Sequence, residues 1–318
     1  MNYFTITNNF IIYKFRAISK YLCDNPILII ILVFSFLLRS YHMDMRDLTI
    51  DEVFSLFYVT DKTFFEIMNP YSLDIKIDAH PPFYYLFVKF WMATGYQLLH
   101  FFTSNRDYSF RFPFALLGTL TTFITYKIGE KVSNKNLGLI FSSLYCLNSF
   151  SIQIAHQTRM YPIIELFSAL ILYNWLFLKT EFSRNRAISL IIFTSLIWLT
   201  YYASIFFIAI VWLTLILLNR KDQKKFFLCA FFCILCCLWW LPGLLGQLNR
   251  ESLESRHLFS TGVIIPFTVF HFITGERDLL LGISSELNNH IIAIASFLMI
   301  ISLLVYKIYK NLLRFEIN

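Results

Sequence analysis

Charged residues are scarce in this sequence. Asp, Glu, Lys and Arg together make up 15% of its 318 residues, whereas an ordinary soluble domain has about 25%. Hydrophobic residues account for 57% of the chain, so a soluble fold would lack the polar side chains needed to cover its surface. The composition therefore excludes an ordinary soluble domain and predicts an integral membrane protein.

Several other features are absent. The sequence has no internal repeat, no low-complexity linker, and no small-residue cleavage site after its first apolar run. No pair of cysteines falls in a predicted external loop, so we expect no structural disulfide. We expect one membrane domain, 1–318, with an uncleaved N-terminal anchor. Four of the six cysteines share one apolar run, where we interpret them as small hydrophobic residues rather than metal ligands: Cys229, Cys233, Cys236 and Cys237.

Long apolar runs recur along the chain. About 20 apolar residues cross a hydrocarbon core as a helix, and shorter runs are also typical of interfacial or re-entrant helices. Ten runs are candidates: 27–41, 82–102, 113–128, 137–152, 163–178, 188–201, 203–218, 226–245, 262–274 and 291–306.

The distribution of Lys and Arg indicates which runs cross, because cytoplasmic loops carry an excess of both. If run 82–102 does not cross, every strong basic patch lies in the cytoplasm. If it crosses, the patches at Lys127, Lys179 and Arg220 move outside. Lys89, in the middle of this run, would also cost about 2.5–3.5 kcal/mol in a spanning helix. The patches are Lys14/Arg16/Lys20, Lys127/Lys131/Lys135, Lys179/Arg184/Arg186, Arg220/Lys221/Lys224/Lys225 and Lys307/Lys310/Arg314.

This topology predicts about eight transmembrane helices, with juxtamembrane helices in the first outer loop. Run 262–274 is too short to span, and Pro266 interrupts it, so we expect it to be interfacial or re-entrant. The formal charge of +7 then reflects topology, and we expect no nucleic-acid partner. The remaining predicted segments are a cytoplasmic N-terminus at 1–26, a first outer loop at 42–112, an outer corner at 153–162, a second outer loop at 246–289 and a cytoplasmic C-terminus at 307–318.

Acidic and imidazole side chains gather at two places in the first outer loop. Asp51 and Glu52 open a predicted amphipathic helix, where they are either a solvated helix cap or a catalytic pair. Asp78 and His80 precede two prolines, which fix the backbone and keep His80 extended. This second motif is as typical of a rigid turn with an aromatic anchor as of a functional site.

Two further groups of polar residues lie on the predicted outer side. Arg159, just outside a predicted span, is a natural partner for a phosphate. The alternative is that its side chain extends to the membrane interface only to keep the guanidinium in water. Glu165 follows one turn into the next helix, and its simplest partner is Arg159. The second of these groups, in the second outer loop, is either solvated or part of the same site: Arg250, Arg256 and His257.

Taken in order, these segments resemble the membrane glycosyltransferases of the C type (GT-C fold). The resemblance is greatest to glycosyltransferase family 39, which includes the protein O-mannosyltransferases and the lipid A aminoarabinose transferases. Order and spacing agree over roughly residues 25–250, and the resemblance implies an all-α polytopic bundle. The matching motifs are Asp51-Glu52, His80-Pro81-Pro82-Phe83-Tyr84-Tyr85, Arg111-Phe112-Pro113 and Thr158-Arg159-Met160-Tyr161.

The resemblance implies that a sugar moves from a polyprenyl-phosphate donor to a protein, lipid or glycan acceptor, with inversion, at the outer face of a bacterial inner membrane. Asp51 would be the general base. Glu52, or Asp78 with His80, would orient it or hold an optional divalent metal ion; no other cofactor is implied. Arg159 would stabilise the leaving phosphate. The expected substrate-binding residues are Asp78, His80, Tyr84, Lys89, Arg159, Tyr161, Glu165, Tyr201 and Arg256.

Two other functions stay open on the sequence. A transporter or flippase of lipid-linked sugars would place ionisable residues at mid-membrane, whereas the polar residues here concentrate in outer loops. The other open function is a catalytically inactive scaffold on the same fold. This possibility stays open because the chain ends sooner after its last apolar run than members of the family do. Some relatives carry a second acidic pair after the third span, where this chain has only Glu165, so metal dependence stays open as well.

Overall fold

The structure is a computed structural model that describes residues 21, 24–71 and 80–248. These residues form helices and loops without a β-strand, which confirms the all-α class for the described part of the chain. Almost all of them belong to one compact unit, Met1–Leu147 with Ser151–Arg250; a second unit comprises Asn148–Phe150 and Glu251–Asn318. The single-domain organisation stays a prediction, and the runs 262–274 and 291–306 lie outside the described residues.

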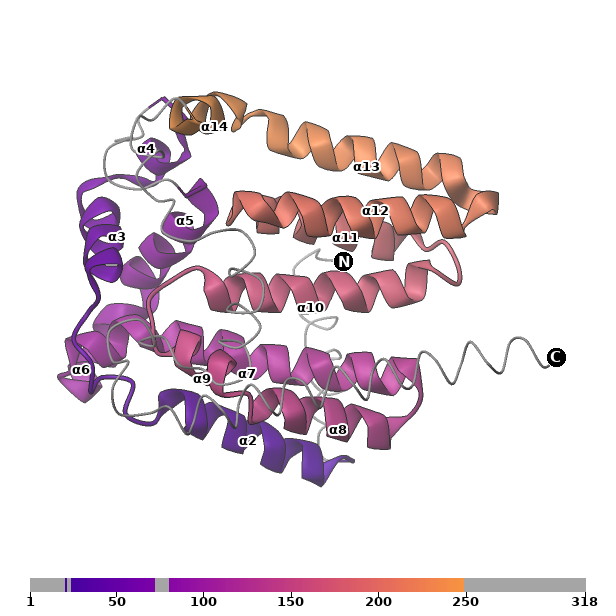
Figure 1. Ribbon diagram of the computed structural model, residues 1–318. Helices are drawn as coiled ribbons and strands as arrows, with labels where there is room; N and C mark the ends of the chain where they lie inside the picture. The colour runs from indigo at the N-terminus through magenta and orange to yellow at the C-terminus, as the bar shows by residue number, and fades with distance from the viewer. Residues whose placement is uncertain (1–20, 22–23, 72–79, 249–318) are drawn as a thin grey trace, which may run out of the picture. The chain divides into compact units, whose positions relative to one another are not determined.

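The longer helices of the first unit run side by side, and the helices of the predicted first outer loop gather at one end of them (Figure 1). The helix after this loop, at Arg106–Val132, packs against the helices at Pro26–Ser40, Lys135–Cys146 and Tyr161–Leu178, so the bundle is built around it. The described apolar runs form helices, but runs 137–152 and 226–245, each expected to be one span, are each divided into two helices. The helices are α2 (Pro26–Ser40), α7 (Arg106–Val132), α8 (Lys135–Cys146), α9 (Ser149–Ala155), α10 (Tyr161–Leu178), α11 (Arg184–Trp198), α12 (Ile205–Leu218), α13 (Gln223–Leu238) and α14 (Leu241–Leu248).

Short helices in the predicted first outer loop begin with strong local signals. Thr49 and Glu52 form a capping box, in which each side chain accepts a hydrogen bond from the other residue's backbone amide. Thr63 and Glu66 form a second one. Run 82–102 is helical, as predicted, but a π-helical turn divides it. The helices are α3 (Ile50–Asp61), α4 (Phe64–Met68), α5 (Pro82–Trp91), η1 (Met92–Tyr96) and α6 (Gln97–Thr103).

Helix α7 begins earlier than the Arg111-Phe112-Pro113 motif, which we expected to open a span. Asn105 caps the helix, which starts at Arg106 and therefore holds the proline in its interior. A proline inside a helix leaves the carbonyl four residues earlier without its helical donor. Here the Ser109 carbonyl accepts a hydrogen bond from Trp91 Nε1 instead, at 2.9 Å. The indole thus satisfies the group that the proline leaves open.

Replacing Trp91 with Phe is expected to destabilise the protein by about 1–3 kcal/mol, because the Ser109 carbonyl loses its donor inside the structure. The measurement is the midpoint of thermal unfolding in detergent. Trp239→Phe is the matched control, because Trp239 is 41% exposed. Equal midpoints for Trp91→Phe and the control would contradict this role of the indole.

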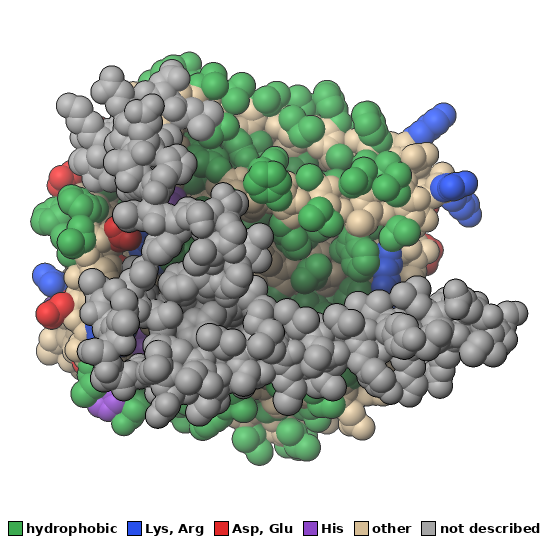
Figure 2. Space-filling model, viewed as in Figure 1, with side chains coloured by type: hydrophobic (Ala, Val, Ile, Leu, Met, Phe, Trp, Pro, Cys, Tyr) green, Lys and Arg blue, Asp and Glu red, His purple; other side chains and the backbone are tan. Residues whose placement is uncertain are grey.

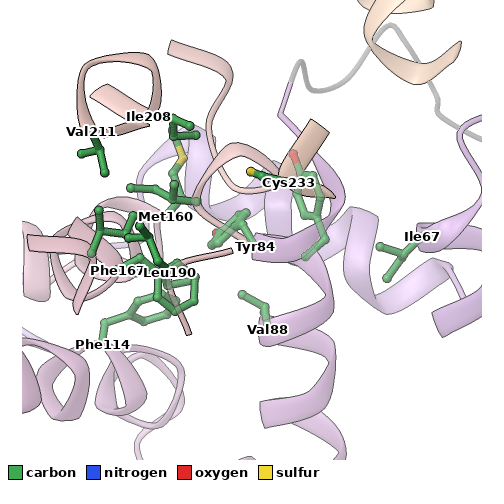
Figure 3. Close-up of a cluster of buried hydrophobic side chains, with 14 of the residues drawn as sticks. Ile67, Tyr84, Val88, Phe114, Met160, Phe167, Leu190, Ile208, Val211 and Cys233 are labelled. Atoms are coloured by element: carbon green, nitrogen blue, oxygen red, sulfur yellow. The ribbon is translucent and has the colours of Figure 1, made fainter. Parts of the chain in front are cut away.

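The hydrophobic core joins the loop helices to the bundle. Buried side chains from α3, α4 and α5 pack in one cluster with those of α7, α10, α11, α12 and α13. Tyr84 and Met160 are at most 1% exposed, and burying a large apolar side chain contributes about 1.5–3 kcal/mol. The core therefore fixes the start of α5 and the corner before α10 to the same framework. Members labelled in Figure 3 are Ile67, Tyr84, Val88, Phe114, Met160, Phe167, Leu190, Ile208, Val211 and Cys233.

A buried polar network links α2 to α10. Arg39 of α2 is 0% exposed and donates to Ser151 Oγ at 3.1 Å. Ser151 Oγ and Tyr145 Oη donate to one carboxylate oxygen of Glu165, at 3.0 and 2.5 Å. We expected Glu165 to pair with Arg159, but its connection to a cation runs through Ser151 to Arg39. Sequence spacing could not indicate this pairing, because it depends on α2 packing against α8.

Gly118 makes room for Arg39 on the facing helix. A Cβ atom at Gly118 would lie 2.6 Å from both Cδ and Nε of Arg39, and the guanidinium is held in place by several hydrogen bonds. Gly118→Ala is therefore expected to destabilise the protein by about 1–3 kcal/mol through overpacking, measured as thermal unfolding in detergent. Leu120→Ala, at a 52% exposed position of the same helix, is the control. An unchanged midpoint for Gly118→Ala would contradict the close fit.

Length and apolarity limit which described helices could cross a membrane by themselves. Helix α10 meets both requirements, and two bent pairs meet them together: α8 with α9, and Tyr202–Leu218 with Arg220–Leu238. Helix α2 is apolar but has 15 residues, or about 22 Å against a hydrocarbon core of about 30 Å. By these criteria the described residues contain one to three candidate spans, and the arrangement with eight belongs to the proposal below.

Candidate functional site

Four segments that are distant in sequence meet at the end of the bundle that carries α3. They are the first turn of α3, the residue that precedes the prolines of α5, the corner before α10, and the corner after α11. The Phe83 amide donates to the Leu199 carbonyl at 2.9 Å, which ties the start of α5 to the end of α11. The sequence motifs around Asp51, His80 and Arg159 are thereby brought together.

Glu52 is part of the framework of this site. Its side chain is 0% exposed and receives both Nε and Nη2 of Arg111, each at 3.1 Å. The Thr158 amide donates to it at 2.6 Å and the Thr49 amide at 2.8 Å. Burial alone would raise the pKa of Glu52, but these hydrogen bonds outweigh burial and hold the pKa below its ordinary value. Glu52 is therefore an ionised anchor that joins α3, α7 and the corner before α10.

Arg111 completes this anchor. Its Nη1 donates to the carbonyls of Met43 and Arg46, at 2.6 and 2.7 Å, and its Nη2 to the carbonyl of Asp47 at 3.1 Å. The guanidinium is 1% exposed and uses its planar fork on both the carboxylate and the backbone. This ion pair fixes the loop that leads into α3.

Asp51 differs from its neighbour in exposure. Its side chain is 57% exposed, and its carboxylate lies 3.7 Å from Nη2 of Arg159. Arg159 is 7% exposed, and its Nη2 is 3.2 Å from His80 Nε2. Its Nη1 approaches the Asp51 carbonyl and Ser55 Oγ, both at 3.4 Å. An accessible carboxylate thus lies beside a fixed arginine and an imidazole, which is an arrangement suited to taking a proton next to a bound anion.

His80 is held from a second side by α14, through a chain of hydrogen bonds that includes Tyr202 and the turn before α14. Trp240 Nε1 donates to Tyr202 Oη at 2.8 Å, Tyr202 Oη donates to Gln247 Oε1 at 2.5 Å, and Gln247 Nε2 donates to the His80 carbonyl at 3.3 Å. Tyr202 Oη therefore both accepts from Trp240 and donates to Gln247, and the phenol links these two side chains. The Tyr201 ring lies 6.3 Å from the His80 ring.

The remaining predicted site residues occupy several positions. Tyr84 Oη donates to the Thr158 carbonyl at 2.5 Å, which supports the corner that carries Arg159. Tyr161, at the start of α10, is 37% exposed. Lys89 lies apart from the group, because its Nζ donates to the Val59 carbonyl at 2.8 Å, near the C-terminal end of α3. Glu165 lies in the buried network with Arg39. Asp78, Arg250, Arg256 and His257 lie outside the described residues.

Two other features bear on what the site could hold. Among the described residues, no group of three or more His, Cys, Asp or Glu side chains is placed to hold a metal ion.

An apolar cavity of about 310 Å³ lies between α11, α12 and α13, and its lining includes Trp198, Trp212 and Leu241. The Trp198 ring contacts the Tyr202 ring at 5.7 Å, so the cavity adjoins the residues that hold His80.

Sequence reasoning missed the supporting residues of this site. Ser55, Tyr202 and Gln247 occupy positions that carry no motif, and their contacts come from helices far apart in the chain. Arg111 was noted only as part of a motif, and its pairing with Glu52 was not predicted. The one local signal was the capping pattern Thr49-x-x-Glu52, which indicates that Glu52 points back to the helix start.

No protein family matches this sequence, and a search of functionally characterised proteins gives no match.

Proposed function

We propose that this protein is a polytopic membrane glycosyltransferase of the GT-C type. It would transfer a sugar from a polyprenyl-phosphate donor to an acceptor hydroxyl at the outer face of a bacterial inner membrane. The observation that carries the proposal is the division between two adjacent acids. Glu52 is buried in an ion pair, whereas Asp51 is exposed beside Arg159 and His80.

The surface of the bundle supports a membrane location. Hydrophobic side chains cover much of the length of α12 and α13 (Figure 2), among them Phe206, Leu213 and Phe231, which are 50% exposed or more. A soluble monomer rarely exposes apolar patches of more than a few hundred Å². In a bilayer such side chains face lipid instead of water.

The distribution of charge supports the proposed orientation. The basic patches that begin at Lys127, Lys179 and Arg220 lie at the end of the bundle opposite α3. Figure 2 shows Lys and Arg side chains projecting from this end, and a few others at the α3 end. Several of these basic side chains contact aromatic rings of neighbouring segments. Lys131 and Arg186 both lie over the Phe177 ring, and Lys225 lies over the Phe182 ring. An excess of basic residues marks the cytoplasmic side, so the site at α3 would face outward.

The proposed reaction follows from the positions of three side chains. The acceptor oxygen attacks the anomeric carbon, and its proton passes to the Asp51 carboxylate. The bond between the anomeric carbon and the phosphate oxygen breaks, and its electron pair leaves with polyprenyl phosphate. Arg159 and His80 would stabilise the charge that grows on this phosphate. The acceptor is a protein, lipid or glycan hydroxyl.

The apolar cavity beside Tyr202 supports a donor with a lipid tail. It is lined by α11, α12 and α13, and the contact between Trp198 and Tyr202 connects it to the segment that carries His80. An amphiphilic donor could therefore place an apolar chain against these helices and its phosphate near Arg159.

The test of this function uses membranes from cells that make the protein, with membranes from cells that lack it as control. A panel of radiolabelled polyprenyl-phosphate hexoses and pentoses is supplied, and label transferred to protein, lipid and glycan is measured. Transfer above control with at least one donor is expected. A folded, membrane-embedded protein that transfers label from none of these donors would contradict the proposal.

A transporter of lipid-linked sugars is the second candidate, and the buried Arg39–Glu165 network favours it, because ionisable residues inside a membrane bundle often mark transport pathways. Movement of labelled donor across vesicles without chemical transfer would identify a transporter. Neither transfer nor movement would identify an inactive scaffold on the same fold.

A further inference from the structure

We propose that the end of the bundle opposite α3 binds the phosphate headgroup of an anionic phospholipid, at a site formed by Lys131 of α7, Arg186 of α11 and the Phe177 ring of α10. This inference rests on the membrane location proposed above, but not on sugar transfer.

Two cations share one aromatic ring at this site. Lys131 Nζ and Arg186 Cζ each lie 4.1 Å from the centre of the Phe177 ring, so they are no farther apart than twice that distance. Each gains from the electron-rich face of the ring, but two like charges this close repel each other. A bound anion would remove that repulsion.

Arg186 is held in a fixed orientation. Its guanidinium also lies 4.9 Å from the centre of the Tyr173 ring, and its Nη1 donates to Asn174 Oδ1 at 3.4 Å. Asn174 is itself 2% exposed, and its Nδ2 donates to the Leu170 carbonyl at 2.8 Å. An arginine that only extends toward water does not require three partners on one helix. A planar guanidinium held this way is preorganised for two parallel hydrogen bonds to a phosphate.

The local charge favours an anion from outside the described chain. Among the described residues, neither Lys131 nor Arg186 has a carboxylate within ion-pair distance. The nearest acid in sequence, Glu130, forms its ion pair with Lys127. Lys179, over the Trp175 ring, adds another positive charge at the end of α10.

A lipid fits this site better than a free anion. The helices that supply the cations expose apolar side chains along their length, including Leu120 of α7 and Ile192 of α11, which are 52% and 48% exposed. A phospholipid offers a phosphate to the cations and acyl chains to this surface at the same time. Basic sites between helices at the cytoplasmic face are known to recognise anionic headgroups, at about 1 kcal/mol per basic residue.

The test measures lipid binding to the purified full-length protein in detergent. Phosphatidylglycerol or phosphatidylcholine is added, and retained lipid is quantified by native mass spectrometry. The site variant is the double mutant Lys131→Gln/Arg186→Gln. The control is Arg184→Gln/Lys221→Gln, which removes the same charge from the same end of the bundle. Thermal unfolding confirms that both variants are folded. Arg186→Lys keeps the charge but removes the planar guanidinium, so it tests whether that geometry matters.

The wild type and the control variant are expected to bind phosphatidylglycerol in preference to phosphatidylcholine. The affinity of the site variant for phosphatidylglycerol should be at least about tenfold lower. Arg186→Lys should fall between them. Equal losses in the two double variants, or none in either, would overturn the specific site. Displacement of the lipid by inorganic phosphate at similar concentration would assign the site to a free anion and overturn the proposal. Release of the protein from membranes by alkaline carbonate would contradict the membrane location itself, which separates that failure from a failure of this site.

Discussion

Replacing Asp51 with Asn is expected to lower sugar transfer by about 10²–10⁴-fold while the protein stays folded. Asparagine has nearly the same shape as aspartate but cannot take the proton of the acceptor. The Asp51 side chain is 57% exposed, and its ion pair with Arg159 is long, at 3.7 Å, so little folding energy depends on it. Initial rates of transfer in membranes with equal amounts of protein measure the effect.

The control for this variant is Asp61→Asn. Asp61 ends the same helix that Asp51 helps to begin, and it is also exposed. The two variants therefore remove the same charge from the same helix, but only one of them removes it beside Arg159. Similar rates for the two variants would show that the Asp51 carboxylate has no catalytic role.

The second large effect is expected at the buried ion pair. Glu52→Gln removes the charge that faces Arg111, while the guanidinium stays 1% exposed. Breaking a buried ion pair by removing one partner typically costs about 3–5 kcal/mol, because the other charge is left without compensation. Thermal unfolding in detergent should show a large decrease in the midpoint. Arg111→Met alone also loses the bonds to the carbonyls of Met43, Arg46 and Asp47. The double variant Glu52→Gln/Arg111→Met should therefore lose less stability than the sum of the two single variants, and additive losses would argue against a coupled pair.

The same pair should make stability depend on pH. The folded protein holds the pKa of Glu52 below its ordinary value, so the unfolded chain takes up a proton first as the pH falls. The stabilisation of the folded state by ionised Glu52 is complete above the unfolded pKa of about 4.3. It is lost as the pH falls through the lower pKa of the folded state. The unfolding midpoint of the wild type should therefore decrease below about pH 4.3 by more than that of Glu52→Gln. Parallel curves would contradict this linkage.

Helix positions could be predicted from the sequence because they depend on local patterns. The apolar runs locate α2, α10 and α12 closely, and the prolines before Phe83 mark the start of α5. The start of α7 could not be predicted, because Pro113 suggested a helix boundary. It lies inside the helix because Trp91, from another helix, satisfies the open carbonyl.

The candidate site was only partly predictable for a related reason. The motifs identified Asp51, His80 and Arg159, and the structure brings these three together. The resemblance gave Asp51 and Glu52 different roles, but the motifs could not indicate that Glu52 is buried and Asp51 exposed. That difference depends on Arg111, which lies 59 residues away from Glu52 along the chain.

Two other residues show the same limit. Lys89 was expected among the substrate-binding residues, but its side chain bonds to the carbonyls at the end of α3. Glu165 was expected to pair with Arg159, but the packing of α2 against α8 places Arg39 in its network. Pairing partners in a helical bundle depend on which helices are neighbours, and local spacing does not contain that information.

The most direct test of the central claim is transfer activity per folded molecule in Asp51→Asn and Glu52→Gln, measured side by side with the wild type. The amount of folded protein is determined by size-exclusion chromatography in detergent, and the initial rate is divided by it. We predict that Asp51→Asn is as abundant as the wild type but at least about 100-fold less active per molecule. Glu52→Gln should yield much less folded protein, with activity per molecule within about tenfold of the wild type. An active Asp51→Asn protein, or a well-folded but inactive Glu52→Gln protein, would contradict the assignment of Asp51 to proton transfer and Glu52 to the framework.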